Sequence, residues 1–179
     1  TGQKLNAIES FSNVEFVCMD KTGTLTENKL KVHSITCLNP TFNQTQIEEL
    51  LGTFANHSTE QNATIRAIQH LPAIAETKYI DEIPFSSDTK MSLLELEIDS
   101  VKRLFIFGAY DILIERLFAE NKTKAVDLYN NKKLSVHRNL FFGEVKGNVD
   151  IKKFKDSNPA IEIVPICILS ISDTVREDV

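Results

Sequence analysis

The spacing of hydrophobic residues changes several times along the chain, and each change predicts a different kind of element. Residues 14–19 and 161–171 form two nearly continuous apolar runs, which are typical of buried strands. Apolar residues three and four positions apart instead predict amphipathic helices. The helices expected from this spacing are 46–56, 62–71, 111–120 and 123–129.

Alternation of apolar and polar residues predicts a second group of strands. Their expected ranges are 30–38, 79–85, 91–98, 101–107 and 134–145. Asp99 and Ser100 separate two of these strands and predict a hairpin with a two-residue loop. Residues 27–29 are polar and predict a connection, whereas residues 146–159 predict an exposed loop. The order of elements favours an α+β fold, with an antiparallel sheet and helices to one side.

Composition and charge narrow the class of protein. The chain has 179 residues, of which 42% are hydrophobic and 25% charged, so it is long enough to bury a core. Its formal net charge of −5 argues against a nucleic-acid partner. Three widely spaced cysteines favour a reduced, cytosolic setting. We find neither a signal peptide nor an apolar run of membrane-spanning length.

The stretch that follows the first apolar run has the residues of a phosphoryl site. Asp20 ends the expected strand, where ligands collect in open α/β sheets, and a strand-end aspartate can act as a nucleophile. Gly23 permits a tight turn, and Lys21 supplies positive charge near a phosphoryl group. An aspartate that only caps a turn is the alternative for an isolated Asp-x-x-Gly pattern.

The uninterrupted sequence Asp-Lys-Thr-Gly-Thr-Leu-Thr at residues 20–26 is identical to the phosphorylation signature of the P-type ATPases, ion pumps of the haloacid dehalogenase superfamily. The resemblance implies that Asp20 accepts a phosphoryl group from ATP and that Lys21 and Thr22 belong to the catalytic site. It also implies a Mg²⁺ ion held by Asp20 and the Thr22 carbonyl. The remaining acidic ligand of the family's Mg²⁺ site is absent from this chain.

A second motif spans Phe85 and Lys90. An adenine ring binds well against an aromatic face, although Phe85 taken alone is more often a core residue. The segment resembles the Phe-Ser-x-x-x-Lys nucleotide site of the calcium-pump-like P-type ATPases. The resemblance implies that Phe85 stacks on adenine and that Lys90 contacts the nucleotide.

A third segment, residues 107–111, resembles the Lys-Gly-Ala-Pro-Glu element of the family. Gly108 and Ala109 are kept and would let the backbone approach a nucleotide. Phe107 replaces the lysine, so we expect low nucleotide affinity. A strand-to-helix turn without any ligand is the alternative for this segment.

Other positions depart from the family pattern or match it weakly. In residues 60–68, where many relatives place a glutamate against the adenine, the corresponding position is read as Ile65, a core residue. Lys133 is aligned with a nucleotide-contacting arginine. Asp173 and Arg176 resemble the Asp-Pro-x-Arg hinge of the family, with threonine in place of the proline.

The resemblance implies three regions: the start of the phosphorylation domain at 1–29, a nucleotide-binding domain at 30–172, and a hinge at 173–179 that returns to a truncated α/β phosphorylation domain. The chain would be the ATP-binding cytosolic portion of a membrane cation pump. Its partners would be ATP and the pump's phosphorylation, actuator and transmembrane domains. By itself it would be monomeric, inactive and a weak nucleotide binder. A resemblance to bacterial cation-transporting ATPase E-type pumps favours a divalent cation such as calcium.

Two other functions stay open. A soluble phosphatase of the haloacid dehalogenase superfamily would carry a second aspartate two residues after the nucleophile, where this chain has Thr22. A non-catalytic adenine-nucleotide-binding module is the third hypothesis, in which the motif around Asp20 would be vestigial.

Overall fold

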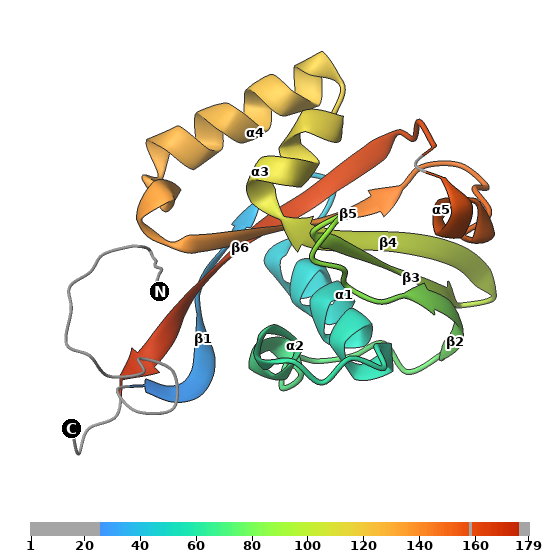
Figure 1. Cartoon of the computed structure of the whole chain (residues 1–179), viewed down its shortest axis with the longest axis horizontal. Helices are drawn as coiled ribbons and strands as arrows, with labels where there is room; N and C mark the ends of the chain where they lie inside the picture. The colour runs from blue at the N-terminus through green and yellow to red at the C-terminus, as the bar shows by residue number, and fades with distance from the viewer. Residues whose placement is uncertain (1–25, 158, 176–179) are drawn as a thin grey trace. The chain divides into compact units, whose positions relative to one another are not determined.

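A six-stranded sheet forms the centre of the computed structural model, which describes residues 26–157 and 159–175. The strands are β1 (Thr26–Cys37), β2 (Thr77–Ile83), β3 (Met91–Ile98), β4 (Val101–Ala109), β5 (Arg138–Val145) and β6 (Ile163–Val175). Their order across the sheet is β1-β6-β5-β4-β3-β2, and the pairs from β2 to β6 are antiparallel (Figure 1). The α+β class is therefore confirmed.

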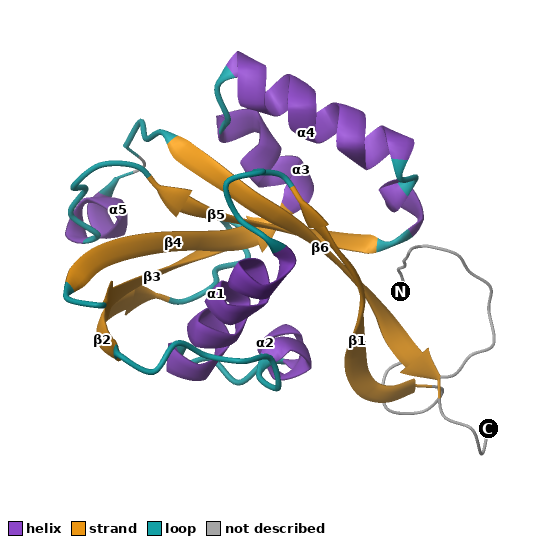
Figure 2. Ribbon diagram, turned by 180° about the vertical axis from the view of Figure 1, so that it is seen from behind, coloured by secondary structure: helices purple, strands orange, loops and turns teal. Residues whose placement is uncertain are grey.

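Helices cover both faces of this sheet. They are α1 (Gln44–His57), α2 (Ala63–Ile68), α3 (Tyr110–Leu113), α4 (Ala119–Asn131) and α5 (Lys152–Asp156), with 3-10 helices η2 (Ile114–Arg116) and η3 (Leu134–Val136). Figures 1 and 2 show α1 and α2 on one face and α3 and α4 on the other. The expectation of helices on one side only is wrong, because β4 presents apolar residues to both faces.

The alternating residues of β4 explain the two cores. Phe105 and Phe107 join the core beneath α1 and α2, whereas Leu104 and Ile106 join the core beneath α3 and α4. A sheet whose central strand is apolar on both sides needs helices on each of its two faces to remove that apolar surface from water. By Cα proximity, Leu30–Ser172 forms one compact unit.

Local sequence sets the boundaries of α1 and of the β3–β4 hairpin. The Asn43 side chain accepts from the Gln46 amide at 2.8 Å, and the Gln46 side chain accepts from the Asn43 amide at 2.9 Å, so α1 begins with a capping box. Asp99 and Ser100 have φ angles of 51° and 68°, which suits a tight turn between twisted strands. The expected helix and the expected hairpin are both confirmed.

Several other boundaries differ from the expectation. Strand β1 includes residues 27–29, since pairing in a sheet does not require apolar side chains. The helix expected at 111–120 ends by Arg116, and α4 begins at Ala119 because Leu117 and Phe118 are extended. Helix α2 ends at Ile68 rather than residue 71.

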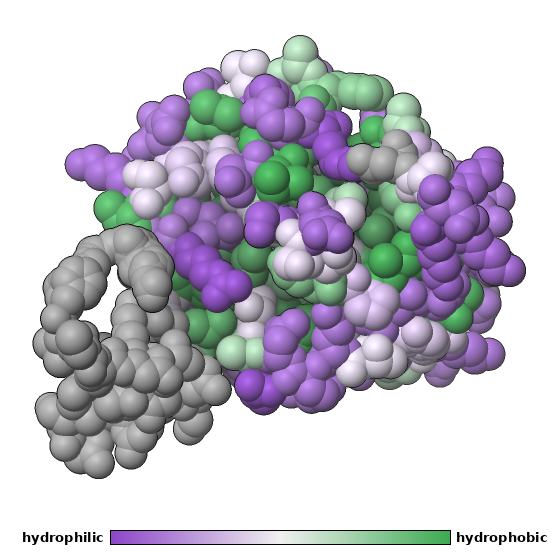
Figure 3. Space-filling view, in the orientation of Figure 1, coloured by the Kyte–Doolittle hydropathy of each residue, from purple (hydrophilic) through white to green (hydrophobic). Residues whose placement is uncertain are grey.

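Two further differences lie in the second half of the chain. Residues 134–136 form η3, so the strand expected from residue 134 begins only at Arg138. The loop expected at 146–159 contains α5, which is anchored by buried Ile151 and by Phe154. Figure 3 shows hydrophilic surface over α5, as its Lys-Lys-Phe-Lys-Asp sequence requires.

Candidate functional site

Two residues of the expected nucleotide site, Phe85 and Gly108, line a cavity of about 320 Å³, which we call the Phe85 cavity. The cavity lies between the α1–α2 connection on one side and the start of β3, the end of β4 and the start of β5 on the other. Its lining residues are Leu30, Glu60, Asn62, Ala63, Thr64, Ile65, Phe85, Ser92, Phe107, Gly108, Arg138 and Leu140. A mostly apolar wall with a few polar groups is typical of small-molecule sites of this size.

Phe85 forms the rim of the Phe85 cavity. It follows β2 and the intervening Pro84, and 46% of its surface is exposed. Its backbone N–H donates to Oε1 of Glu60 at 2.9 Å, so the Phe85 backbone is attached to the α1–α2 connection. A half-exposed aromatic ring at the edge of a cavity can stack on a flat ligand.

The floor of the cavity is aromatic and apolar. Phe107 is only 5% exposed, and its ring centroid lies 5.3 Å from that of Phe54 and 6.1 Å from that of Phe142. Ser92 lies opposite Phe107 in the β3–β4 ladder and donates its hydroxyl to the Phe107 carbonyl at 3.3 Å. The position where the family has a lysine therefore belongs to a packed aromatic cluster.

Arg138 brings positive charge to the cavity from the first position of β5. Its side chain is exposed, and no ion pair or hydrogen bond joins that side chain to another residue in the described part of the chain. A guanidinium carries a permanent charge and a planar set of donors suited to phosphate. Sequence reasoning missed it because the strand was expected to begin at residue 134, which obscured the alternation of Arg138 with Leu140 and Phe142.

Glu60 supplies a carboxylate beside Phe85. Partial burial raises the pKa of the Glu60 carboxyl, the hydrogen bond from the Phe85 amide lowers it, and the nearby Glu82 carboxylate raises it further. From the sequence, no residue was expected to replace the glutamate that relatives place against the adenine, and Ile65 was assigned to that position. Ile65 is indeed a core residue at 1% exposure, but it also lines the cavity together with Glu60.

Gly108 is required by the packing of two strands as well as by the cavity. A Cβ atom at Gly108 would lie 2.3 Å from the Lys90 carbonyl oxygen and 2.7 Å from the Met91 Cα. The Ala109 amide donates to the same Lys90 carbonyl at 3.0 Å. Only glycine permits this close approach between the β4 end and the start of β3.

The structure brings only part of the expected site together. Phe85 and Gly108 line the cavity, whereas Lys90, Ala109 and Lys133 are not among its lining residues. Lys90 and Lys133 are exposed and have φ angles of 57° and 54°.

The remaining expected residues cannot be placed in a site. Asp20, Lys21, Thr22 and Arg176 lie outside the described residues, and Asp173 is described only as part of β6. The expected Mg²⁺ ligands are among them. Within residues 26–157 and 159–175, no cluster of three or more His, Cys, Asp or Glu side chains is arranged to hold a metal ion.

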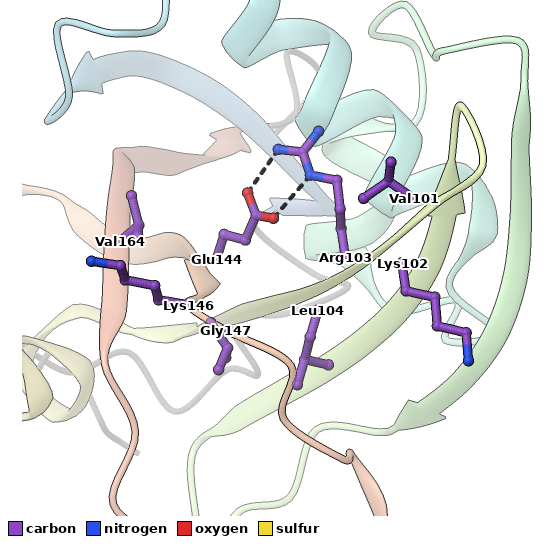
Figure 4. Close-up of a pocket in the computed structure, with 9 residues that line it drawn as sticks. Val101, Lys102, Arg103, Leu104, Glu144, Lys146, Gly147 and Val164 are labelled. Carbon is purple, nitrogen blue, oxygen red and sulfur yellow. Dashed lines mark hydrogen bonds and ion pairs between the residues drawn. The ribbon is translucent and has the colours of Figure 1, made fainter.

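A second cavity, of about 380 Å³, lies at the opposite ends of β4 and β5, and we call it the Arg103 cavity. Arg103 donates from Nε and from an Nη atom to the two carboxylate oxygens of Glu144, at 2.9 and 2.7 Å. Lys102 and Lys146 extend to either side of this pair (Figure 4). The hydrogen bonds with Glu144 raise the pKa of Arg103.

Comparison with known proteins adds independent information. No family model matches the chain. It is 34% identical over 115 residues to "Probable cation-transporting ATPase exp7" of Streptococcus pneumoniae, covering 63% of this chain and 14% of that protein. It is 32% identical over 119 residues to "Calcium-transporting ATPase CtpE" of Mycobacterium tuberculosis, covering 63% and 14%.

A third relative matches over a longer stretch. The chain is 27% identical over 150 residues to "Probable cation-transporting P-type ATPase" of Mycoplasma pneumoniae, covering 78% of this chain and 17% of that protein. The chain thus spans about a seventh of the length of the first curated relatives it matches. None of the helices within the described residues is long and apolar enough to cross a bilayer. Both the signature at residues 20–26 and these relatives make the chain similar to cation-transporting P-type ATPases.

Proposed function

We propose that the chain is the ATP-binding portion of a cation-transporting P-type ATPase and that the Phe85 cavity holds the nucleotide. The observation that carries this proposal is the combination of an exposed aromatic ring, a carboxylate and an arginine around one cavity. These groups match three features of ATP: the flat face of adenine, the amino group of adenine and the phosphates. The names of the relatives agree with this assignment.

In this proposal the adenine ring stacks on Phe85 above the apolar floor formed by Phe107 and Leu140. One oxygen of Glu60 already accepts from the Phe85 amide, so the other oxygen accepts a hydrogen bond from the adenine amino group. Arg138 binds a phosphate of the nucleotide. Adenine and phosphates therefore contact opposite walls of the cavity, the first from the α1–α2 connection and the second from β5.

The family resemblance implies further nucleotide contacts from residues that do not line the cavity. Lys90, Ala109 and Lys133 would have to reach the nucleotide from outside the lining of the cavity. A phenylalanine at position 107 offers no charge to a phosphate, so we propose a low affinity for ATP.

We further propose that residues 30–172 are the nucleotide-binding domain, inserted between 1–29 and 173–179, which belong to the phosphorylation domain and its hinge at Asp173 and Arg176. In the whole pump, a carboxylate oxygen of Asp20 attacks the γ-phosphorus of ATP, the bond to the bridging oxygen breaks, and ADP leaves. Lys21, which follows Asp20 in the sequence, would belong to the same catalytic site. Asp20 and the Thr22 carbonyl would hold a Mg²⁺ ion that neutralises developing phosphate charge.

The whole protein would then be a membrane-bound pump with this segment facing the cytoplasm, and its other domains would be the chain's partners. The transported ion would be a divalent cation such as calcium, by analogy with relatives of that name. The chain alone would be monomeric and would not form the aspartyl-phosphate, because the family's other Mg²⁺ ligand is missing.

The test of the nucleotide site is an NMR titration of the chain with ATP. We expect the amide signals of Glu60, Phe85, Gly108 and Arg138 to shift, while Arg103 cavity signals such as that of Gly147 stay unchanged. Shifts confined to the Arg103 cavity, or none by millimolar ATP, would contradict the proposal. Shifts at Lys90, Ala109 or Lys133 would add those residues to the site.

The inactivity of the chain is tested separately. Incubation with radiolabelled ATP and Mg²⁺, followed by acid precipitation, should leave no label on the protein. Robust labelling that disappears in the variant Asp20→Asn would show that the chain phosphorylates itself.

A further inference from the structure

Glu82 is a buried acidic residue in a place that the nucleotide proposal does not use. It is the penultimate residue of β2, only 7% of its surface is exposed, and it pairs with Leu94 in the β2–β3 ladder. Glutamate is almost never buried unless its carboxylate is paired or hydrogen-bonded. The contacts of this carboxylate therefore indicate what it does.

Three hydrogen bonds reach this carboxylate from the two residues that follow α1. The Ser58 hydroxyl donates to Oε2 at 2.7 Å, and the Thr59 hydroxyl and amide both donate to Oε1, at 2.7 and 3.0 Å. Hydrogen bonds to an ionised carboxylate are about twice as strong as neutral ones. Glu82 thus attaches the end of α1 to β2, although it is 24 residues from Ser58 and 23 residues from Thr59 in the sequence.

The next residue, Glu60, binds in the opposite direction, from the segment after α1 to the segment after β2. Its Oε1 accepts from the Phe85 amide at 2.9 Å, and its own amide donates to the Ser58 hydroxyl at 3.2 Å. Each of the two chain segments therefore contributes one carboxylate that binds the other segment. We call Ser58, Thr59, Glu60, Glu82 and Phe85 the two-carboxylate clasp.

Glu82 is not among the residues that line the Phe85 cavity, whereas Glu60 and Phe85 both are. Any effect of Glu82 on a ligand must therefore pass through those two residues. Fixing a binding group before the ligand arrives removes part of the entropy cost of binding.

We propose that Glu82 is a positioning residue, which fixes residues 58–60 so that Glu60 and the Phe85 ring are held ready for a flat base. The inference rests on the proposed function for its ligand, but the clasp itself exists without one. The clasp holds the Phe85 backbone through its amide, although nearly half of the residue's surface is exposed.

The first test needs no nucleotide. In the free protein, Glu82→Ala should shift the Phe85 and Glu60 amide signals and speed hydrogen exchange at the Phe85 amide, because the partner segment is released. Glu82→Gln keeps one carbonyl acceptor and should give a smaller change. Glu97→Gln on β3, which makes the same change to a side chain outside both the clasp and the cavity, should leave these signals unchanged.

The second test measures affinity for adenosine and ATP. Glu82→Ala should weaken both ligands by the same factor, roughly tenfold, since the clasp holds the base and not the phosphates. Ser58→Ala removes one donor with less risk to folding and should weaken both by about threefold. A lower melting temperature with unchanged affinity for both ligands would reduce Glu82 to a structural role and overturn the inference.

The two proposals fail in different ways. If the unaltered protein does not bind ATP, the nucleotide assignment is wrong, and the amide experiment still decides whether the clasp fixes Phe85. If ATP binds but Glu82→Ala leaves the Phe85 amide and both affinities unchanged, the nucleotide assignment stands and the positioning role is wrong.

Discussion

The two cavities of this domain lie at opposite ends of the same pair of strands, and they differ in how their charges are used. In the Arg103 cavity the guanidinium is fixed by two hydrogen bonds to Glu144 and lies 5.1 Å from the centroid of the Phe105 ring. In the Phe85 cavity, Arg138 has no ion-pair partner among the described residues, and an aromatic ring is exposed. The arginine of the larger cavity is therefore paired within the protein, whereas the arginine of the smaller cavity is not paired within the described residues.

Under the proposed function, the unpaired arginine distinguishes the ligand site, although the Arg103 cavity has the larger volume. A guanidinium already paired with a carboxylate must lose that pair before it can bind a phosphate. An arginine in water has no such competitor and can use all its donors for a ligand. Matched substitutions in the two cavities test this contrast.

The largest effect is expected from the glycine in each cavity. Gly108→Ala places a Cβ against the backbone of Lys90 and Met91, so it should lower the free energy of unfolding by about 3 kcal/mol. Gly147→Ala meets no atom within 4 Å but has a φ of 86°, so it should cost only about 1–2 kcal/mol. Urea denaturation of both variants measures the difference, and equal losses would show that the strand contact is not tight.

The aromatic rim gives the second contrast. Phe85→Ala removes the stacking surface and should weaken ATP binding by roughly tenfold or more, as measured by isothermal titration. Val101→Ala in the Arg103 cavity removes a side chain that is 58% exposed and should leave ATP affinity unchanged. If the two variants bind ATP equally well, Phe85 is not the platform for adenine.

The two arginines should respond in opposite ways. Arg138→Gln should weaken ATP by about tenfold and leave adenosine affinity unchanged, because only the phosphates lose a partner. Arg103→Gln should keep ATP affinity but lower the free energy of unfolding by about 1–2 kcal/mol, because Glu144 loses a charged donor. Calorimetric titration and thermal denaturation of both variants separate the roles, and a loss of ATP affinity in Arg103→Gln would contradict them.

Much of the fold follows from local sequence. The β3–β4 hairpin depends on alternation and on the turn at Asp99 and Ser100, and α1 depends on apolar spacing and on its cap at Asn43. Spacing could not reveal the break between η2 and α4, because Leu117 and Phe118 continue the apolar pattern while their backbone becomes extended. Only packing against the sheet decides which way that segment turns.

The site is less predictable than the fold, for a physical reason. Phe85 lies in a contiguous motif and could be expected from the sequence. Glu60 is 25 residues from the amide it binds, and Arg138 reaches the cavity through the pairing of β5 with β4. Contacts made across strands and loops leave no local pattern, so a family resemblance directed attention to Lys133 instead.

The smallest predicted effect concerns the carboxylate of the Phe85 cavity. Burial raises the pKa of Glu60, so the folded protein takes up a proton there at a higher pH than the unfolded chain. Acidification through that pKa therefore favours the folded state through Glu60 but removes an acceptor for the adenine amine. Adenine binding should therefore weaken at acid pH, while protonation of Glu60 does not lower the free energy of unfolding.

Adenosine is the appropriate ligand for this measurement, because it has no phosphate whose protonation would also change with pH. We expect its affinity in the unaltered protein to fall as the pH is lowered from neutral through the raised pKa of Glu60. Glu60→Gln, which keeps an acceptor oxygen for the Phe85 amide and does not titrate, should show no such fall. An equal fall in both proteins would assign the pH dependence to another group, whereas a fall restricted to the unaltered protein would place the adenine amine against Glu60.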